Sequence, residues 1–365
     1  MRRIVSIEVE KRLAPPRWLQ ILAPVLSLLL ALSAIGIIFL LVGVDPFFAY
    51  SEIFQGAFGS VYGLSETVVK SIPLMLCGVG LTLAFRARFW NIGAEGQLLI
   101  GATCATALAL AYPEWPKAVL LSAMFLVGFV GGALWGLIPA ILKARWRVDE
   151  TITSLMMVYI ASNLVKYLVY GPWKGPEERG FPYTSKFSPS AQLPRLAWTR
   201  IHYPTLLLAL ALAVVVYVLI RYTKWGYQIR VTGENPAAAR YAGMSYLKTV
   251  ILVMILSGGL AGVAGVGEVA GIHYRLRYPE GISPGYGFTA IIVAWLARLN
   301  PLGAVVTSLL LGGLLVGGDA IQVSLGLPSA TVYVFNGAIL LFVLAGDLIA
   351  RYRIRLKSME LKEVS

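Results

Sequence analysis

Long apolar runs, separated by short polar stretches, recur along the whole chain. Ten such segments can be distinguished, and with flanking residues most reach the length of about 20 residues that a helix needs to cross a membrane. They cover residues 19–44, 67–85, 93–112, 118–142, 152–169, 203–220, 249–270, 287–297, 302–316 and 332–350. The pattern predicts an all-α protein, a polytopic bundle of about ten transmembrane helices.

We expect one membrane domain at 19–350, with a cytoplasmic N-terminal tail at 1–18 and a cytoplasmic C-terminal tail at 351–365. The eighth segment is short and ends at Asn300-Pro301, which is typical of a half-helix or a re-entrant piece. The third segment begins in a glycine-containing stretch. Some of the helices are therefore expected to be broken.

The placement of Lys and Arg predicts the orientation. Most of the 31 basic residues fall in the two tails and in the loops of alternate segments, the longest of which is the loop at 221–248. Cytoplasmic loops are enriched in Lys and Arg, so we expect both termini inside and an even number of spans. This topology also explains the net charge of +13, and we expect no nucleic-acid partner.

The loop at 221–248 contains the features of a short helix outside the membrane. Asn235 can cap a helix, Pro236 suits the first helical position, and Gly243 can adopt the left-handed conformation after the last turn. Gly233 allows the chain to turn into this helix. We therefore expect a two-turn cytoplasmic helix at 236–242. It is either an ordinary connection or a docking element that transmits force from a partner.

Polar side chains near the start of the third segment are candidates for a functional site. Asn91, Glu95 and Gln97 lie within a stretch that contains several glycines. An ionisable group inside a membrane is costly and is by default a functional hypothesis. The alternative is that Glu95 pairs with Arg86 or Arg88 and anchors the end of the helix.

A polar stripe along the fifth segment is a second candidate. It includes Tyr159, Asn163 and Lys166 at helical spacing. Such a stripe faces a water-filled path, or it forms hydrogen bonds to neighbouring helices. The sequence leaves both interpretations open.

Motifs of enzymes are missing from the sequence. It contains no G-x-x-x-x-G-K-[ST] phosphate loop and no nucleophile elbow. His202 and His273, the two histidines, are far apart and make a poor metal site, while Cys77 and Cys104 lie in apolar runs. We expect no catalytic residues, no metal and no cofactor in this chain.

Five motifs together resemble one family. They are NIGAEGQ at 91–97, ETI at 150–152 leading to GPWK at 171–174, GENPAAARYAG at 233–243, GYGFT at 285–289 and AWLA at 294–297. Over about residues 60–345 the chain resembles the permease subunits of ABC importers for nucleosides and related simple sugars. These are ribose-type, branched-chain-like permeases.

The resemblance implies a multi-pass protein of a prokaryotic plasma membrane, with partners. These would be a second permease subunit (a related chain or a second copy), an extracytoplasmic substrate-binding protein, and a cytoplasmic ATPase that uses ATP and Mg²⁺. The coupling region of the family corresponds here to Gly233, Glu234, Asn235, Pro236, Ala239, Arg240 and Gly243.

The same resemblance suggests substrate contacts on the membrane domain. Asn91, Glu95, Gln97 and Asn163 could donate or accept hydrogen bonds with a ribose or base, and Tyr159 or Phe288 could stack on a ring. We favour a nucleoside over a free sugar because the 91–97 pattern looks more like the nucleoside branch. The alternatives are an ion-coupled secondary transporter, for which broken helices and intramembrane acids are also suitable, and a scaffold or receptor that transports nothing.

Overall fold

Two compact units make up the computed structural model, which describes residues 3–11, 17–177, 180–326 and 352–360 with scattered residues between 331 and 346. One unit is formed by Met1–Tyr50 with Pro328–Ser365, and the other by Ser51–Leu327. The first contains α1 (Arg17–Leu41) and an antiparallel pair of strands, β1 (Arg3–Lys11) and β2 (Tyr352–Glu360). The apolar pattern predicts neither strand.

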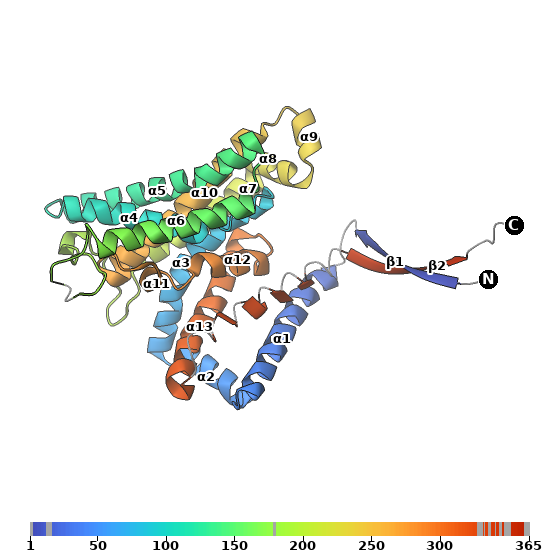
Figure 1. Cartoon of the computed structure of the whole chain (residues 1–365), viewed down its shortest axis with the longest axis horizontal. Coiled ribbons are helices and arrows are strands. Elements are labelled where there is room, and N and C mark those ends of the chain that lie inside the picture. Colours follow the sequence, from blue (N-terminus) through green and yellow to red (C-terminus); the bar gives the residue numbers. More distant parts are fainter. Residues whose placement is uncertain are drawn as a thin grey trace. The chain divides into compact units, whose positions relative to one another are not determined.

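Helices form most of the remaining described structure (Figure 1), as the sequence predicts. In chain order they are α2 (Pro46–Phe58), α3 (Val61–Arg86), α4 (Ala94–Ala111), α5 (Lys117–Trp146), α6 (Glu150–Tyr170), α7 (Tyr203–Tyr222), α8 (Lys224–Glu234), α9 (Pro236–Tyr241), α10 (Tyr246–Gly267), α11 (Pro279–Ile282), α12 (Tyr286–Leu296) and α13 (Pro301–Leu325). Two short turns join them, the 3₁₀ turn η1 (Pro189–Ala191) and the π-helical turn η2 (Glu268–His273), which continues α10.

Seven described helices are long and apolar enough to cross a membrane, or eight if α1 and α2 form one bent span. The last predicted segment, 332–350, lies largely outside the described residues. With 11 residues α12 is about 16 Å long, too short to cross by itself, which agrees with the expectation that the eighth segment is a half-helix or a re-entrant piece. The third segment differs from expectation because α4 is one unbroken helix of 18 residues, and the irregular stretch precedes it.

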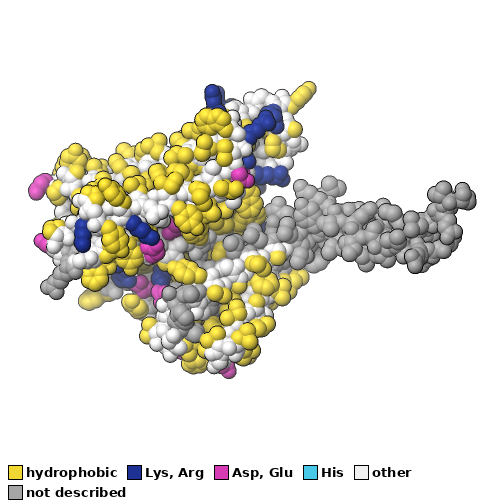
Figure 2. Space-filling view, in the orientation of Figure 1, with side chains coloured by type: hydrophobic (Ala, Val, Ile, Leu, Met, Phe, Trp, Pro, Cys, Tyr) yellow, Lys and Arg dark blue, Asp and Glu magenta, His cyan; other side chains and the backbone are white. Residues whose placement is uncertain are grey.

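Helices α3, α4 and α10 form the centre of the larger unit. Between 72% and 89% of their most apolar windows is buried, compared with 28–33% for α5, α6 and α7. Figure 2 shows hydrophobic side chains over much of the face where α5 and α6 lie. A protein whose peripheral helices expose apolar side chains requires a hydrocarbon solvent, which is consistent with a bundle embedded in a bilayer.

Glycines bring α5 and α10 into close contact. A Cβ atom added to Gly132 would lie 2.3 Å from the carbonyl oxygen of Gly258, and one added to Gly262 would lie 2.1 Å from that of Gly128. Small residues let helix backbones approach within a membrane, where lipid tails supply no hydrophobic drive for association. The small-residue run at 258–267 on α10 therefore packs tightly against α5.

Candidate functional site

The predicted short helix outside the bundle is present as α9 (Figure 1). The side chain of Asn235 accepts a hydrogen bond from the Ala238 amide at 3.0 Å, and Pro236 occupies the first helical position. Gly243 has a φ of +74°, in the left-handed region that favours glycine. The helix ends at Tyr241, with Ala242 as its C-terminal cap, one residue earlier than expected.

Gly233 has a different role from the one its position suggests. It lies inside α8, a helix that the apolar pattern does not predict, and not at a turn into α9. A Cβ at Gly233 would be 2.0 Å from the carbonyl oxygen of Arg86. The absence of a side chain therefore lets α8 pack directly on the end of α3, which attaches the α8–α9 segment to the membrane domain.

Most of α9 projects away from its support. Ala239 is 2% exposed and anchors the helix, whereas Asn235, Pro236 and Arg240 are exposed. Tyr241 is 97% exposed, although tyrosine is a residue that usually buries much of its ring. Sequence reasoning missed Tyr241 as a candidate; the signal was an aromatic residue in the last turn of a short polar helix.

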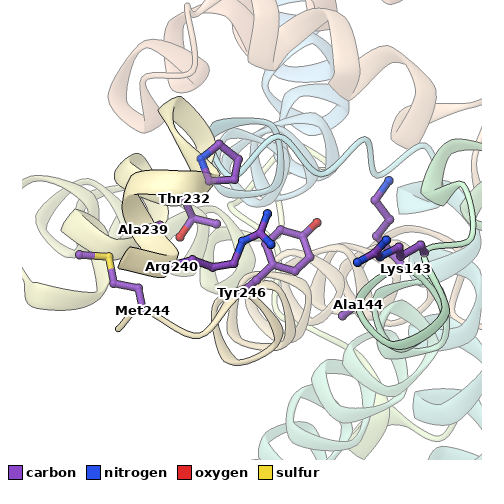
Figure 3. A pocket seen from close by; sticks show the side chains of 9 residues that line it. Lys143, Ala144, Thr232, Ala239, Arg240, Met244 and Tyr246 are labelled. Atoms are coloured by element: carbon purple, nitrogen blue, oxygen red, sulfur yellow. The ribbon is translucent and has the colours of Figure 1, made fainter. Parts of the chain in front are cut away.

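A cavity of about 420 Å³ lies beside α9 (Figure 3). Lys143 and Ala144 at the end of α5 line one side, and Thr232, Ala239 and Arg240 line the other. Further basic side chains gather at this end of the molecule (Figure 2). The α8–α9 end thus combines an exposed aromatic ring, basic groups and a hollow, which together suit contact with another protein.

An ion pair and a helix cap stabilise the neighbouring junction between α5 and α6. Lys143 pairs with the buried carboxylate of Glu150 at 2.6 Å. Asp149 caps α6 by accepting from the amides of Thr151 and Ile152 at 2.8 and 3.0 Å. The amide of Ile152 and then that of Thr151 lower the pKa of Asp149 below its usual value, because hydrogen bonds to the charged form favour it. The cap therefore stays ionised near neutral pH.

The candidate group at 91–97 is buried and internally paired. Asn91 and Gln97 exchange two amide hydrogen bonds of 3.0 Å, and Asn91 also donates to the hydroxyl of Ser257 at 3.2 Å. Asn91 is fully buried and Gln97 is 1% exposed. In this conformation the pair connects the start of α4 to α10.

Glu95 lies at the start of the half-helix α12. Its Oε2 accepts a hydrogen bond from the Gly287 amide at 2.6 Å, and a Cβ on Gly287 would be 2.2 Å from the Glu95 nitrogen. Arg86 instead donates to the carbonyl of Leu299 at 2.8 Å. The carboxylate therefore satisfies a helix N-terminus inside the bundle, which carries unpaired amides and a partial positive charge.

The remaining candidates lie on the surface of the unit. Tyr159 is 58% exposed and Asn163 is also exposed, with its amide donating to the Tyr159 carbonyl at 2.9 Å. Lys166, further along α6, pairs with Glu280 of α11 at 3.2 Å. Phe288, on α12, is 39% exposed. The structure therefore separates an exposed α6 stripe from the buried 91–97 group.

The opposite end of the unit holds a polar cluster around η2. Arg200 pairs with Glu66 at 3.1 Å, and Arg195 donates to the carbonyls of Gly271 and Ile272 at 2.9 and 3.1 Å. His202, at the N-terminus of α7, is fully buried, and neither of its ring nitrogens has a hydrogen-bond partner within the part of the chain that the structure describes. Burial first, and then Arg195 and Arg200, lower the pKa of His202 to about 4.

Comparisons with known proteins agree on one family. Residues 63–344 match the model of a family described as branched-chain amino acid transport system, permease component. The chain is 37% identical over 361 residues to the glucose ABC transporter permease protein TsgB13 of Haloferax volcanii, covering 96% of this chain and 94% of that protein.

Two relatives come from one strain of Bacillus subtilis. The guanosine ABC transporter permease protein NupP is 34% identical, covering 90% of this chain and 94% of that protein. The guanosine ABC transporter permease protein NupQ is 27% identical, covering 67% of this chain and 78% of that protein. The similarity to NupP and TsgB13 extends over nearly the whole chain.

Proposed function

Because this chain belongs to the family of branched-chain amino acid transport system permease components, we propose that it forms half of the translocation path of an ATP-driven importer in a prokaryotic cell membrane. It is a multi-pass membrane protein and the permease subunit of an ABC transporter. A permease is a membrane subunit, so no catalysis is expected from it. ATP and Mg²⁺ are used by a separate cytoplasmic ATPase, and a substrate-binding protein delivers the solute from outside.

The observation that carries this proposal is the form of α9. The ATPase docks on its exposed side, with Tyr241 as the anchor and Arg240 beside it. Ala239 is buried and Gly233 is in contact with α3, so movement of the docked ATPase passes to α8 and the membrane domain as a rigid-body displacement. The other coupling residues, Glu234, Asn235, Pro236 and Gly243, shape the ends of this helix.

The second permease subunit faces the exposed stripe of α6. Asn163 and Lys166 lie on a membrane-spanning helix, where contact with lipid would be costly. A water-filled path between two permease subunits removes this cost. NupP and NupQ are two distinct guanosine permease proteins of one organism, which favours a related chain over a second copy.

The transported solute is a small neutral compound with hydroxyl groups, a nucleoside in first place and a simple sugar in second. Relatives named for guanosine and for glucose cover nearly the whole chain, so the relatives alone leave both open. Tyr159 and Phe288 offer partly exposed rings for stacking on a base. Asn91, Glu95 and Gln97 contact the solute only if the path opens beside α4, because they are buried here.

Docking is tested by Tyr241→Ala in the assembled transporter. We expect ATP-driven uptake to fall at least tenfold and co-purification of the ATPase to weaken, because an exposed aromatic anchor is worth about 2 kcal/mol or more at an interface. Tyr222→Ala, at a tyrosine that is 73% exposed at the same end, is the control and should leave both unchanged. Full uptake with the ATPase retained in the Tyr241 variant would refute docking at α9.

The solute is tested by uptake into proteoliposomes that contain the permeases, ATPase and substrate-binding protein. We expect uptake of radiolabelled guanosine to exceed that of glucose and to require ATP. A preference for glucose would reverse the order of the two solutes. Uptake that continues without the ATPase and collapses with an ionophore would support a secondary transporter instead.

A further inference from the structure

A second cavity, of about 400 Å³, lies at the same end of the molecule as α8 and is lined by arginine. Four arginines contribute to it from four places in the chain: Arg86 at the end of α3, Arg221 in the last turn of α7, Arg230 on α8, and Arg298 between α12 and α13. Its volume falls within the range of about 300–1000 Å³ that is usual for ligand pockets.

Contacts to backbone atoms hold the wall of this cavity in place. Arg86 donates from Nη2 to the Leu299 carbonyl at 2.8 Å, which connects α3 to the α12–α13 loop. The same residue is in backbone contact with Gly233 of α8. The Nε atom of Arg86 is buried without a hydrogen-bond partner among the described residues. A buried donor of this kind indicates a missing acceptor.

The cavity has more positive charge than the stabilisation of helix C-termini explains. Cations near helix C-termini are favourable, which accounts for Arg86 and Arg221. Arg230 lies inside α8, so it is not explained in this way. No acidic residue belongs to the described lining, and Glu234, one turn beyond Arg230, is exposed and outside it. The nearest acidic group that acts on this wall is therefore Glu234, which interacts electrostatically with Arg86 from outside the described lining.

The cavity lies beside apolar surfaces. Val214 and Val218 of α7 are 52% and 43% exposed, on the face of the helix that leads to Arg221. Leu302 and Val306, in the first turns of α13, are 39% and 59% exposed, and α13 packs against α7. The head of a ligand bound here would contact the basic groups, and its tail would lie along the apolar surfaces of α7 and α13.

We propose that this cavity binds the phosphate headgroup of an anionic phospholipid from the cytoplasmic leaflet. Guanidinium groups match phosphate oxygens in geometry and charge, and basic pockets between membrane helices on the cytoplasmic side recognise such headgroups. The assignment to this leaflet rests on the orientation in the proposed function. A bound headgroup would connect α3, α7, α8 and the α12–α13 loop, and so hold the support of the docking helix.

The test uses the full-length chain purified in neutral detergent and titrated with dioleoylphosphatidylglycerol or dioleoylphosphatidylcholine, with retained lipid measured by native mass spectrometry. We expect preferential retention of phosphatidylglycerol. The double variant Arg221→Gln with Arg230→Gln should weaken this binding about 25-fold, because each arginine contributes about fivefold. The control removes two exposed charges at the same end outside the cavity, Arg145→Gln with Lys248→Gln, and should retain the preference.

Three results would overturn the proposal. They are equal retention of phosphatidylglycerol by the cavity variant and wild type, an equal loss in the control, and displacement of the lipid by millimolar sodium phosphate, which would assign the site to free phosphate. If the double variant does not fold, Arg221→Gln alone should show about a fivefold loss, since this side chain is exposed. Binding is measured without ATPase or transport, so the result for headgroup binding is independent of the proposed function, on which only the choice of leaflet rests.

Discussion

The structure changes the interpretation of Glu95, because it shows the hydrogen-bond partner of this residue. In the sequence it is an acid in an apolar segment, which suggests a substrate contact. In the structure its carboxylate accepts the amide of Gly287, which is 192 residues away. No local pattern could indicate this contact, because it depends on α12 beginning inside the bundle beside α4. A role in substrate binding stays a prediction.

Glu95→Ala should lower the thermal stability of the purified chain. The substitution leaves the buried Gly287 amide without an acceptor, at a cost of about 1–3 kcal/mol. Glu95→Gln keeps an acceptor oxygen and should cost less. Intrinsic fluorescence during heating in detergent measures both variants. An alanine variant as stable as wild type would show that this hydrogen bond contributes little.

His202 is the other residue whose surroundings decide its chemistry. Burial between η2 and α7 lowers its pKa from 6.5 to about 4, so the folded protein keeps the ring neutral while an unfolded chain takes up a proton. This contribution to stability is complete above pH 6.5 and is lost as the pH falls towards 4.

We expect acidification from pH 7 to pH 5 to lower the free energy of unfolding by about 2 kcal/mol through His202. His202→Gln cannot titrate, so its melting temperature should depend less on pH over this range. The comparison is between the two pH profiles, which separates titration from any constant loss of packing. Parallel profiles would mean that His202 is not the responsible group.

At the scale of elements, local sequence signals specify the position of one cytoplasmic-end helix, α9, whereas tertiary packing specifies the position of its neighbour, α8. Asn235, Pro236 and Gly243 specify α9 through capping and turn chemistry within one short stretch, so its position was predicted to within a residue. Helix α8 has one such signal, the hydroxyl of Thr223 that caps its start by accepting from the Gly226 amide, and this helix is not among those predicted from the sequence. Its position depends on Gly233 fitting against Arg86, a contact that exists only in the folded chain.

The contact between α5 and α10 can be tested at Gly132. Gly132→Ala places a methyl group 2.3 Å from the Gly258 carbonyl, where the backbone must move, and should destabilise the chain by about 1–3 kcal/mol. Leu134→Ala, at a side chain that is 59% exposed on the same helix, is the control and should have little effect. Thermal unfolding in detergent measures both. Equal stability of the two variants would contradict close packing here.

At the scale of the whole molecule, the exposed surfaces of α6 and α7 differ in polarity. Helix α7 exposes valine and leucine side chains, whereas α6 exposes Tyr159 and Asn163 alongside apolar side chains such as Ile160. Both helices are long and apolar enough to cross a membrane. Lipid suits the α7 surface, while the amide of Asn163 on α6 would be costly in contact with lipid, so water or another protein subunit beside it is the prediction.

Water access to the α6 stripe can be measured by thiol labelling. In a chain with Cys77→Ser and Cys104→Ala, Asn163→Cys in the assembled transporter should react with a charged, membrane-impermeant methanethiosulfonate. Val215→Cys, at a residue of α7 that is 56% exposed, should react at least tenfold more slowly because lipid covers it. Slow labelling of both positions would indicate that α6 also faces lipid or a dry interface.

The amino-acid sequence alone is enough to predict the class of fold, most of the helices, the short helix at the α8–α9 end and the family. These follow from local quantities, namely the length of apolar runs, helix capping and the order of motifs along the chain. Three features became visible only in the packed structure. The group at Asn91, Glu95 and Gln97 is buried, whereas the stripe on α6 is exposed. Tyr241 is exposed, and four arginines from distant parts of the chain line one cavity. The burial of a side chain and the charges around it depend on residues that are distant in sequence, so both are defined only when the helices pack together.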